Sequence, residues 1–146
     1  MEATLAEPPA PQVSSLPKIG NFIGGEWVEA RSGRYLENVE PATGKVYSLV
    51  ADSDARDVDM AVAAAAEAFD GWSRTAASER SRILLRIADL IERDLGKLAL
   101  AESIDTGKPL SLARSLDIPR SASNFRFFAT AILHTASEAH ITDNVA

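Results

Sequence analysis

Arg120 is the residue of this sequence whose type and setting best suit ligand binding. It follows Asp117, Ile118 and Pro119. Asp117 is predicted to cap the start of a helix, and Pro119 suits the first helical turn, where its missing N–H is not needed. Free backbone N–H groups at such a helix end favour an anion, and a guanidinium can bind a carboxylate through two parallel hydrogen bonds. The alternative is a structural ion pair of Arg120 with Asp117 or another acid, and spacing alone favours it because most arginines are solvated or paired.

Gly107 and Lys108 invite comparison with a phosphate-binding loop. That motif needs another glycine where Glu102 stands and a Ser or Thr where Pro109 stands, so we reject it. No Gly-x-Gly-x-x-Gly run occurs either, and no histidine accompanies a serine in a hydrolase motif. The sequence therefore predicts no cofactor-binding residues by motif and no hydrolytic site.

His134, Glu138 and His140 are spaced closely enough to suggest metal ligands. Only two histidines are present, and the helical pattern fades before His140, so solvent-exposed polar residues are the favoured interpretation and no metal site is predicted. The 146 residues contain no cysteine. Thiolate zinc sites, disulfides and cysteine nucleophiles are therefore excluded within these residues.

The elements that must position these side chains are short strands followed by helices. Residues 1–17 hold four of the seven prolines and are predicted to be a disordered tail. A hairpin is expected over residues 21–28, with its turn at Gly24 and Gly25, and a second strand pair over residues 35–39 and 45–50. Helical periodicity then predicts helices over residues 54–71, from Thr75 or Ser78 to Asp94, over residues 95–107 and over residues 117–134.

The first predicted helix has a defined start and a marked apolar face. Asp57 stands three residues after Asp54, which is the spacing of a capping box. Residues that recur with the helical period share one face of it: Val58, Ala61, Val62, Ala65 and Phe69.

Charge and hydropathy exclude several classes of partner. The chain has 15 Lys and Arg against 21 Asp and Glu, a net charge of −6, and no basic block, which argues against nucleic acid. Apolar runs are too short to span a membrane, and the first seventeen residues carry no Lys or Arg, unlike a secretory or transit peptide. An acidic cytoplasmic protein is therefore expected.

Several motifs, in order, resemble the amino-terminal portion of the aldehyde dehydrogenase superfamily. They are residues 21–28, Pro41 to Gly44, Asp57 to Asp59 with the alanine-rich helix to Phe69 and Trp72, Arg80 to Ile91, and Asp105 to Pro109. The later stretch of residues 112–129, including Arg120, looks most like the branch acting on 2-aminomuconic and 2-hydroxymuconic semialdehydes. The resemblance implies an α/β fold: the N-terminal part of a Rossmann-like cofactor domain over residues 18–146, here short β-hairpins followed by four or five α-helices.

The resemblance also implies a function. Members of the superfamily oxidise aldehydes to carboxylic acids with NAD, using a cysteine nucleophile, a glutamate base and an oxyanion-binding asparagine. We expect those catalytic residues and the NAD-binding residues to lie beyond Ala146, so this chain alone is expected to be inactive. Arg120 matches a position expected to hold the substrate carboxylate, so the resemblance favours substrate binding by Arg120 over a structural ion pair. The expected partners are a small aldehyde substrate and further copies of the complete enzyme, as a dimer or tetramer.

Two other interpretations stay open. One is a noncatalytic truncated product that associates with partners through exposed helix faces. The other is an unrelated small helical binding module, which the ordered motifs disfavour. A cysteine in a Gly-Gln-x-Cys setting downstream of Ala146 would favour the dehydrogenase, whereas a stop codon after Ala146 would favour the truncated product.

Overall fold

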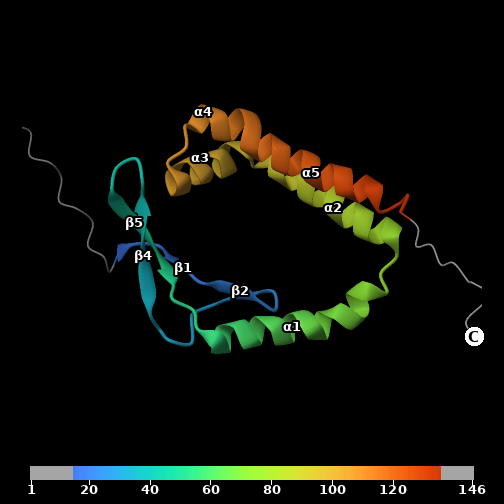
Figure 1. Cartoon of the computed structure of the whole chain (residues 1–146), viewed down its shortest axis with the longest axis horizontal. Coiled ribbons are helices and arrows are strands. Elements are labelled where there is room, and N and C mark those ends of the chain that lie inside the picture. Colours follow the sequence, from blue (N-terminus) through green and yellow to red (C-terminus); the bar gives the residue numbers. More distant parts are fainter. Residues whose placement is uncertain (1–14, 136–146) are drawn as a thin grey trace, which may run out of the picture. The chain divides into compact units, whose positions relative to one another are not determined.

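The computed structural model describes residues 15–135, and the chain divides into two compact units (Figure 1). The first contains the described residues up to Asp70 together with Asp105–Gly107, and the second contains Gly71–Ile104 and the described residues from Lys108 onward. Most of the predicted tail lies outside the described residues. Pro17, at its end, accepts a hydrogen bond of 2.8 Å from the N–H of Leu49.

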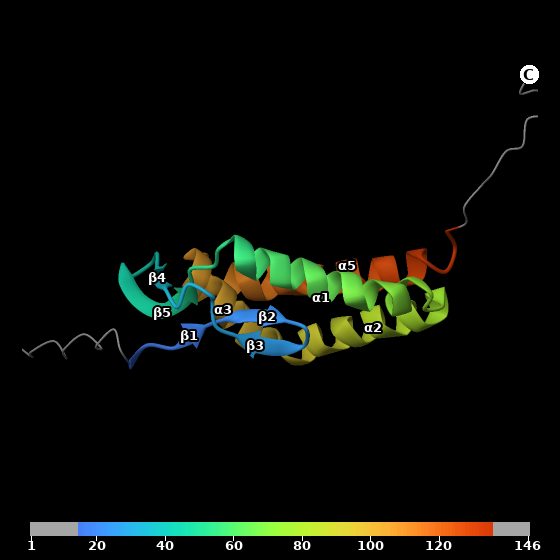
Figure 2. The same ribbon diagram turned by 90° about the horizontal axis from the view of Figure 1, so that it is seen from below.

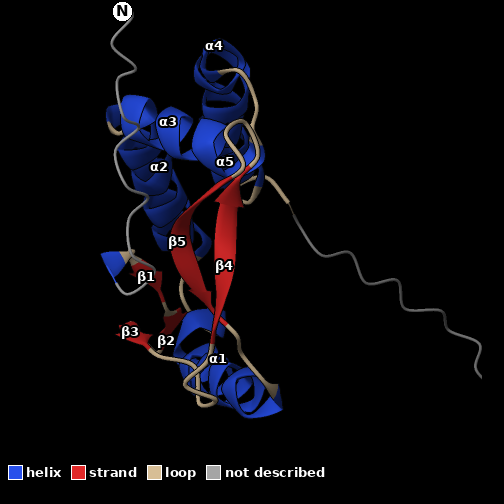
Figure 3. Ribbon diagram, turned by 90° about the vertical axis from the view of Figure 1, so that its left-hand side faces the viewer, coloured by secondary structure: helices blue, strands red, loops and turns tan. Residues whose placement is uncertain are grey.

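The first unit contains all the strands: β1 (Lys18–Ile19), β2 (Asn21–Ile23), β3 (Glu26–Val28), β4 (Tyr35–Glu40) and β5 (Lys45–Ala51). β2 and β3 form the predicted hairpin, with Phe22 opposite Trp27. Gly24 and Gly25 have φ angles of 63° and 89°, the positive values that a two-residue hairpin turn of this type requires. β4 and β5 form the second predicted hairpin (Figure 3), and β1 pairs with β5 in parallel, which the sequence did not indicate.

Helix α1 (Ala55–Ser73) begins at the predicted capping box. The Asp54 carboxylate accepts a hydrogen bond of 2.9 Å from the N–H of Arg56, and the Asp57 carboxylate accepts one of 2.9 Å from the N–H of Asp54. The other oxygen of Asp57 accepts a hydrogen bond of 2.9 Å from the N–H of Arg31. Asp57 is only 2% exposed, so this carboxylate joins the start of α1 to the segment after β3 in the interior of the unit.

The second unit is helical: α2 (Ala77–Arg93), α3 (Leu95–Thr106, whose last two residues belong to the first unit), α4 (Leu110–Leu112), a π-helical turn η2 (Ala113–Asp117) and α5 (Ile118–Ala131). α2 and α5 pack against each other and run in opposite directions (Figure 2). The buried positions on them are small, namely Ser81, Ala88, Ala122 and Ala129. Small side chains allow the two helices to approach closely. The predicted break at Asp94 is confirmed, since α2 ends there and α3 follows at once.

Gly107 ends α3 as the sequence predicts. Its φ angle is +72°, the left-handed conformation that glycine adopts without a side-chain clash. A Cβ atom at this position would lie 3.0 Å from the Cβ of Pro41. The glycine is therefore favoured both by the backbone conformation and by the close approach of Pro41 in the β4–β5 turn.

A polar cluster beside Gly107 joins the end of α3 to the β4–β5 hairpin. The Asp105 carboxylate accepts hydrogen bonds from the Tyr47 hydroxyl at 2.6 Å and from the Asn38 amide at 3.1 Å. The bond from Tyr47 is the main cause that lowers the pKa of Asp105 below 3.8, and the same bond raises the pKa of Tyr47 above 10.0. Sequence reasoning missed this cluster because 58 and 67 residues separate its members and no local pattern marks them.

Large apolar side chains are mostly exposed in the described part of the chain. No large side chain there is fully buried, and the buried hydrophobic residues are alanines together with Leu49. The predicted apolar face of α1 is continuous but uncovered: Val58, Val62 and Phe69 are 59%, 62% and 66% exposed. These helices therefore bury too little apolar surface to form a large core of their own.

We expect the isolated 146-residue chain to melt weakly and without cooperativity, or to aggregate, although its circular dichroism should be helical. The reason is the small core, since cooperative unfolding depends on tight burial of large apolar side chains. Thermal melts at two protein concentrations, with binding of an apolar dye, would check this. A sharp two-state transition independent of concentration would contradict it.

Candidate functional site

Arg120 lies near the start of α5, and its side chain is exposed. Within residues 15–135, the structure gives it no hydrogen bond and no ion pair. A guanidinium that is exposed and unpaired in this way has its five N–H donors available for a ligand. This fits the predicted carboxylate-binding role, which stays a prediction.

The predicted helix start at Asp117 is wrong. Asp117 has helical backbone angles (φ −67°, ψ −50°) and its side chain caps nothing. Helical structure begins after Pro109, and runs through α4 and the π-helical turn η2 into α5. In that turn the N–H of Ile118 bonds to the carbonyl of Ala113, five residues back. Arg120 therefore does not lie at a free helix end, and the dipole argument does not apply to it.

Pro119 explains why the helical path changes here. In a regular α-helix its ring would clash with the carbonyl of Ser115, and its missing N–H would leave that carbonyl without a bond. A π-helical turn directly before the proline accommodates this change in the hydrogen-bonding pattern. The sequence signal was thus real, but the proline marks an irregular turn inside a helix instead of a first turn.

The alternative interpretation, a structural ion pair of Arg120 with Asp117 or another acid, is not seen among the described residues. Asp117 instead bonds to Lys108, with 2.7 Å between Oδ2 and Nζ. Glu102 lies 3.7 Å from the same ammonium group. The bond to Asp117 is the main cause that raises the pKa of Lys108 above 10.5. Lys108 is thus engaged by carboxylates, in agreement with the rejection of a phosphate-binding loop.

Arg126, six residues after Arg120 on α5, shows what a structural arginine looks like in this unit. Its guanidinium bonds to Glu92 at 2.5 Å and to Asp89 at 3.0 Å, both on α2. These bonds raise the pKa of Arg126, and the bond to Glu92 has the larger effect. Arg126 therefore holds α5 to α2, whereas Arg120 has no such task in the described part of the chain.

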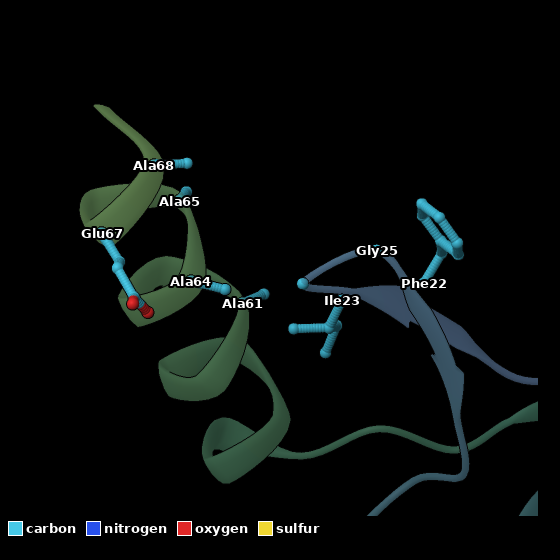
Figure 4. A pocket seen from close by; sticks show the side chains of 9 residues that line it. Phe22, Ile23, Gly25, Ala61, Ala64, Ala65, Glu67 and Ala68 are labelled. Atoms are coloured by element: carbon cyan, nitrogen blue, oxygen red, sulfur yellow. The ribbon is translucent and has the colours of Figure 1, made fainter. Parts of the chain in front are cut away.

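An open groove of about 650 Å³ lies beside α1 in the first unit. Figure 4 shows that alanines of α1 (Ala61, Ala64, Ala65, Ala68) face the tip of the β2–β3 hairpin across it. Its one charged lining residue is Glu67. The groove offers apolar contact but no cation, so it does not suit the phosphates of a dinucleotide.

Residues 15–135 contain no group of three or more side chains arranged to hold a metal ion. His134 is described and exposed, whereas Glu138 and His140 lie outside the described residues. None of the helices described here is both long and apolar enough to cross a membrane.

Short strands followed by helices define an α/β architecture for the described residues. Residues 27–145 match the model of the aldehyde dehydrogenase family. The chain belongs to the aldehyde dehydrogenase family, and the predicted family and fold class are confirmed.

Named relatives agree with this assignment. The chain is 49% identical over 125 residues to the 2-aminomuconic semialdehyde dehydrogenase of Bos taurus, covering 86% of this chain and 25% of the relative. The Homo sapiens enzyme of the same name is 46% identical over 132 residues, covering 90% of this chain and 27% of the relative. The crystal structure of PnpE in complex with nicotinamide adenine dinucleotide matches with a TM-score of 0.81 at 40% identity, covering 84% of this chain and 25% of that one. The chain thus spans about a quarter of the length of the proteins it matches.

Proposed function

We propose that this chain is part of an NAD-dependent dehydrogenase that oxidises a carboxylate-bearing, muconic-type semialdehyde to the carboxylic acid. The observation that carries the substrate class is the exposed Arg120 guanidinium, which has no ion-pair partner among the described residues. Relatives at 46–49% identity that are named 2-aminomuconic semialdehyde dehydrogenases support the same class. A carboxylate at the far end of the substrate is the group that a guanidinium binds best.

NAD is proposed as the cofactor because a similar protein of known structure holds it. The groove beside α1 does not itself fit a dinucleotide. The groove beside α1 carries a carboxylate and no cation, and the sequence has no glycine-rich dinucleotide motif. We therefore place the NAD site, together with the cysteine, glutamate and asparagine of catalysis, in other parts of the complete enzyme.

The proposed assembly is a homodimer or homotetramer of the complete enzyme in the cytoplasm. The alternative, a noncatalytic protein that acts through helix-mediated association, is favoured by one observation. Phe127 and Phe128 stand next to each other on α5, with ring centroids 5.2 Å apart, and both are exposed. Exposed aromatic pairs of this kind suit a protein contact.

The test is an assay of the complete enzyme, expressed from the uninterrupted coding sequence. NADH formation should be fast with 2-aminomuconic or 2-hydroxymuconic semialdehyde and much slower, at equal low substrate concentration, with an uncharged aldehyde of similar length. The 146-residue chain serves as the inactive control. The noncatalytic alternative is preferred if the full coding sequence encodes no cysteine nucleophile. It is also preferred if the complete protein fails to reduce NAD with every aldehyde that is assayed.

A further inference from the structure

Asp117 and Arg120 are spaced so that they would normally attract each other. They are three residues apart in a helical segment, and oppositely charged side chains at that spacing lie on neighbouring parts of the helix surface. An Arg120 paired with Asp117 would have to give up that partner before it bound a substrate carboxylate. Lys108, however, bonds to Asp117 at 2.7 Å.

Lys108 is itself held in place by α3. The hydroxyl of Ser103 donates a hydrogen bond of 2.6 Å to the carbonyl of Lys108, and Glu102 lies 3.7 Å from its ammonium group. The Lys108 and Asp117 side chains are 32% and 28% exposed, so this pair is better shielded from water than an ordinary surface pair. The ammonium group of Lys108 thus lies beside Asp117 in a partly shielded pair.

The π-helical turn adds a second constraint at the same residue. A π-helical turn contains one residue more than an α-helical turn, which rotates the residues after it by about 100° relative to a regular helix. Asp117 is the last residue of η2, and Arg120 follows in the next turn. The direction of Arg120 therefore depends on where η2 ends, at Asp117. The bond between Asp117 and Lys108 connects this residue to the segment that follows α3.

We infer that Lys108 is a positioning residue for Arg120, because its ammonium group bonds to Oδ2 of Asp117 and so competes with the Arg120 guanidinium for that carboxylate, which leaves Arg120 available to a substrate carboxylate. This inference rests on the proposed function of Arg120. It assigns Lys108 no contact with substrate. Its effect should appear in the binding of carboxylate-bearing substrates and not in the chemical step.

The test uses the complete enzyme with the Lys108→Met substitution. The KM for a carboxylate-bearing semialdehyde should rise about three- to five-fold, as expected for competition from a partly shielded ion pair. The kcat, and the KM for an uncharged aldehyde, should stay within about two-fold. Adding Asp117→Asn to Lys108→Met should restore the KM, because the competing carboxylate is gone. Lys97→Met, which removes an exposed lysine of α3, is the matched control and should change neither KM.

The outcomes separate a positioning role from a merely structural one. The inference is overturned if Lys108→Met raises the KM for both aldehydes alike. It is also overturned if adding Asp117→Asn to Lys108→Met fails to restore the KM for the carboxylate-bearing semialdehyde. Should the methionine variant not fold, Lys108→Gln keeps a hydrogen-bond donor but no charge and should raise the KM less. If Arg120→Ala does not distinguish the two substrates, the proposed function fails and the inference fails with it. If Arg120→Ala does distinguish them, a crystal structure of the Lys108→Met enzyme tests the inference alone. That structure should show an ion pair between Asp117 and Arg120, and its absence would refute the positioning role.

Discussion

Replacing Arg120 by alanine in the complete enzyme should raise the KM for a carboxylate-bearing semialdehyde by about 30-fold or more. Removing one partner of a charged hydrogen-bonded pair costs about 2–5 kcal/mol, and every 1.4 kcal/mol is about a tenfold change in affinity. An uncharged aldehyde has no group for the guanidinium to bind, so its KM should stay within about two-fold. Steady-state kinetics with both substrates measures the contrast.

Two further variants make the Arg120 experiment specific. Arg120→Lys keeps the charge but loses the planar pair of donors, so its KM should fall between the wild-type and alanine values. Arg114 is an exposed arginine of the same helical segment, in the π-helical turn, and Arg114→Ala is the matched control for loss of surface charge. An equal rise of KM for both aldehydes in the Arg120→Ala enzyme would show that Arg120 does not recognise the carboxylate.

Replacing Asp57 by alanine should cause a large loss of stability in the first unit. The change removes the acceptor for the backbone N–H groups of Arg31 and Asp54, each bonded at 2.9 Å. Leaving buried donors unsatisfied costs about 1–3 kcal/mol for each group. We therefore expect a loss of about 2–4 kcal/mol, allowing for partial access of water to the vacated site.

Hydrogen exchange of the complete enzyme, followed by mass spectrometry, can locate this effect. Amides at the start of α1 should exchange roughly 30-fold faster or more in the Asp57→Ala enzyme, because local opening becomes easier by at least about 2 kcal/mol. Asp59→Ala is the matched control, since Asp59 is an exposed carboxylate two residues further along the same helix. Similar exchange rates in the two variants would mean that the buried carboxylate contributes little.

Features coded by neighbouring residues were predicted well. The Gly24–Gly25 turn, the capping box at Asp54 and the helix end at Gly107 all depend on backbone conformations that one or a few adjacent residues impose. Asp57 shows the limit of such reasoning. Its spacing from Asp54 predicted the cap, but its bond to Arg31, 26 residues earlier, had no local signal.

The surroundings of Arg120 depended on distant residues and were predicted poorly. Spacing placed Arg120 at a free helix end with Asp117 as its cap. In the structure the helix begins at Leu110 and contains a π-helical turn before Pro119, and Asp117 forms an ion pair with Lys108. A local pattern shows that a proline disturbs a helix, but not whether the helix begins there or bends there. That choice depends on whether preceding residues find packing and hydrogen-bond partners elsewhere.

The sequence by itself determined the two hairpins and the main helices, because these follow from residue types and local spacing, and its ordered motifs carried the resemblance that pointed to the family and to Arg120 as the candidate site residue. Only the tertiary structure decided which carboxylate Lys108 binds, that β1 joins β5 in parallel, and that Asp105 bonds to Tyr47 and Asn38. Each of these is a choice among several chemically equivalent partners. Charge and hydrogen-bonding capacity are the same for every such partner, and only the path of the folded chain brings one of them within bonding distance.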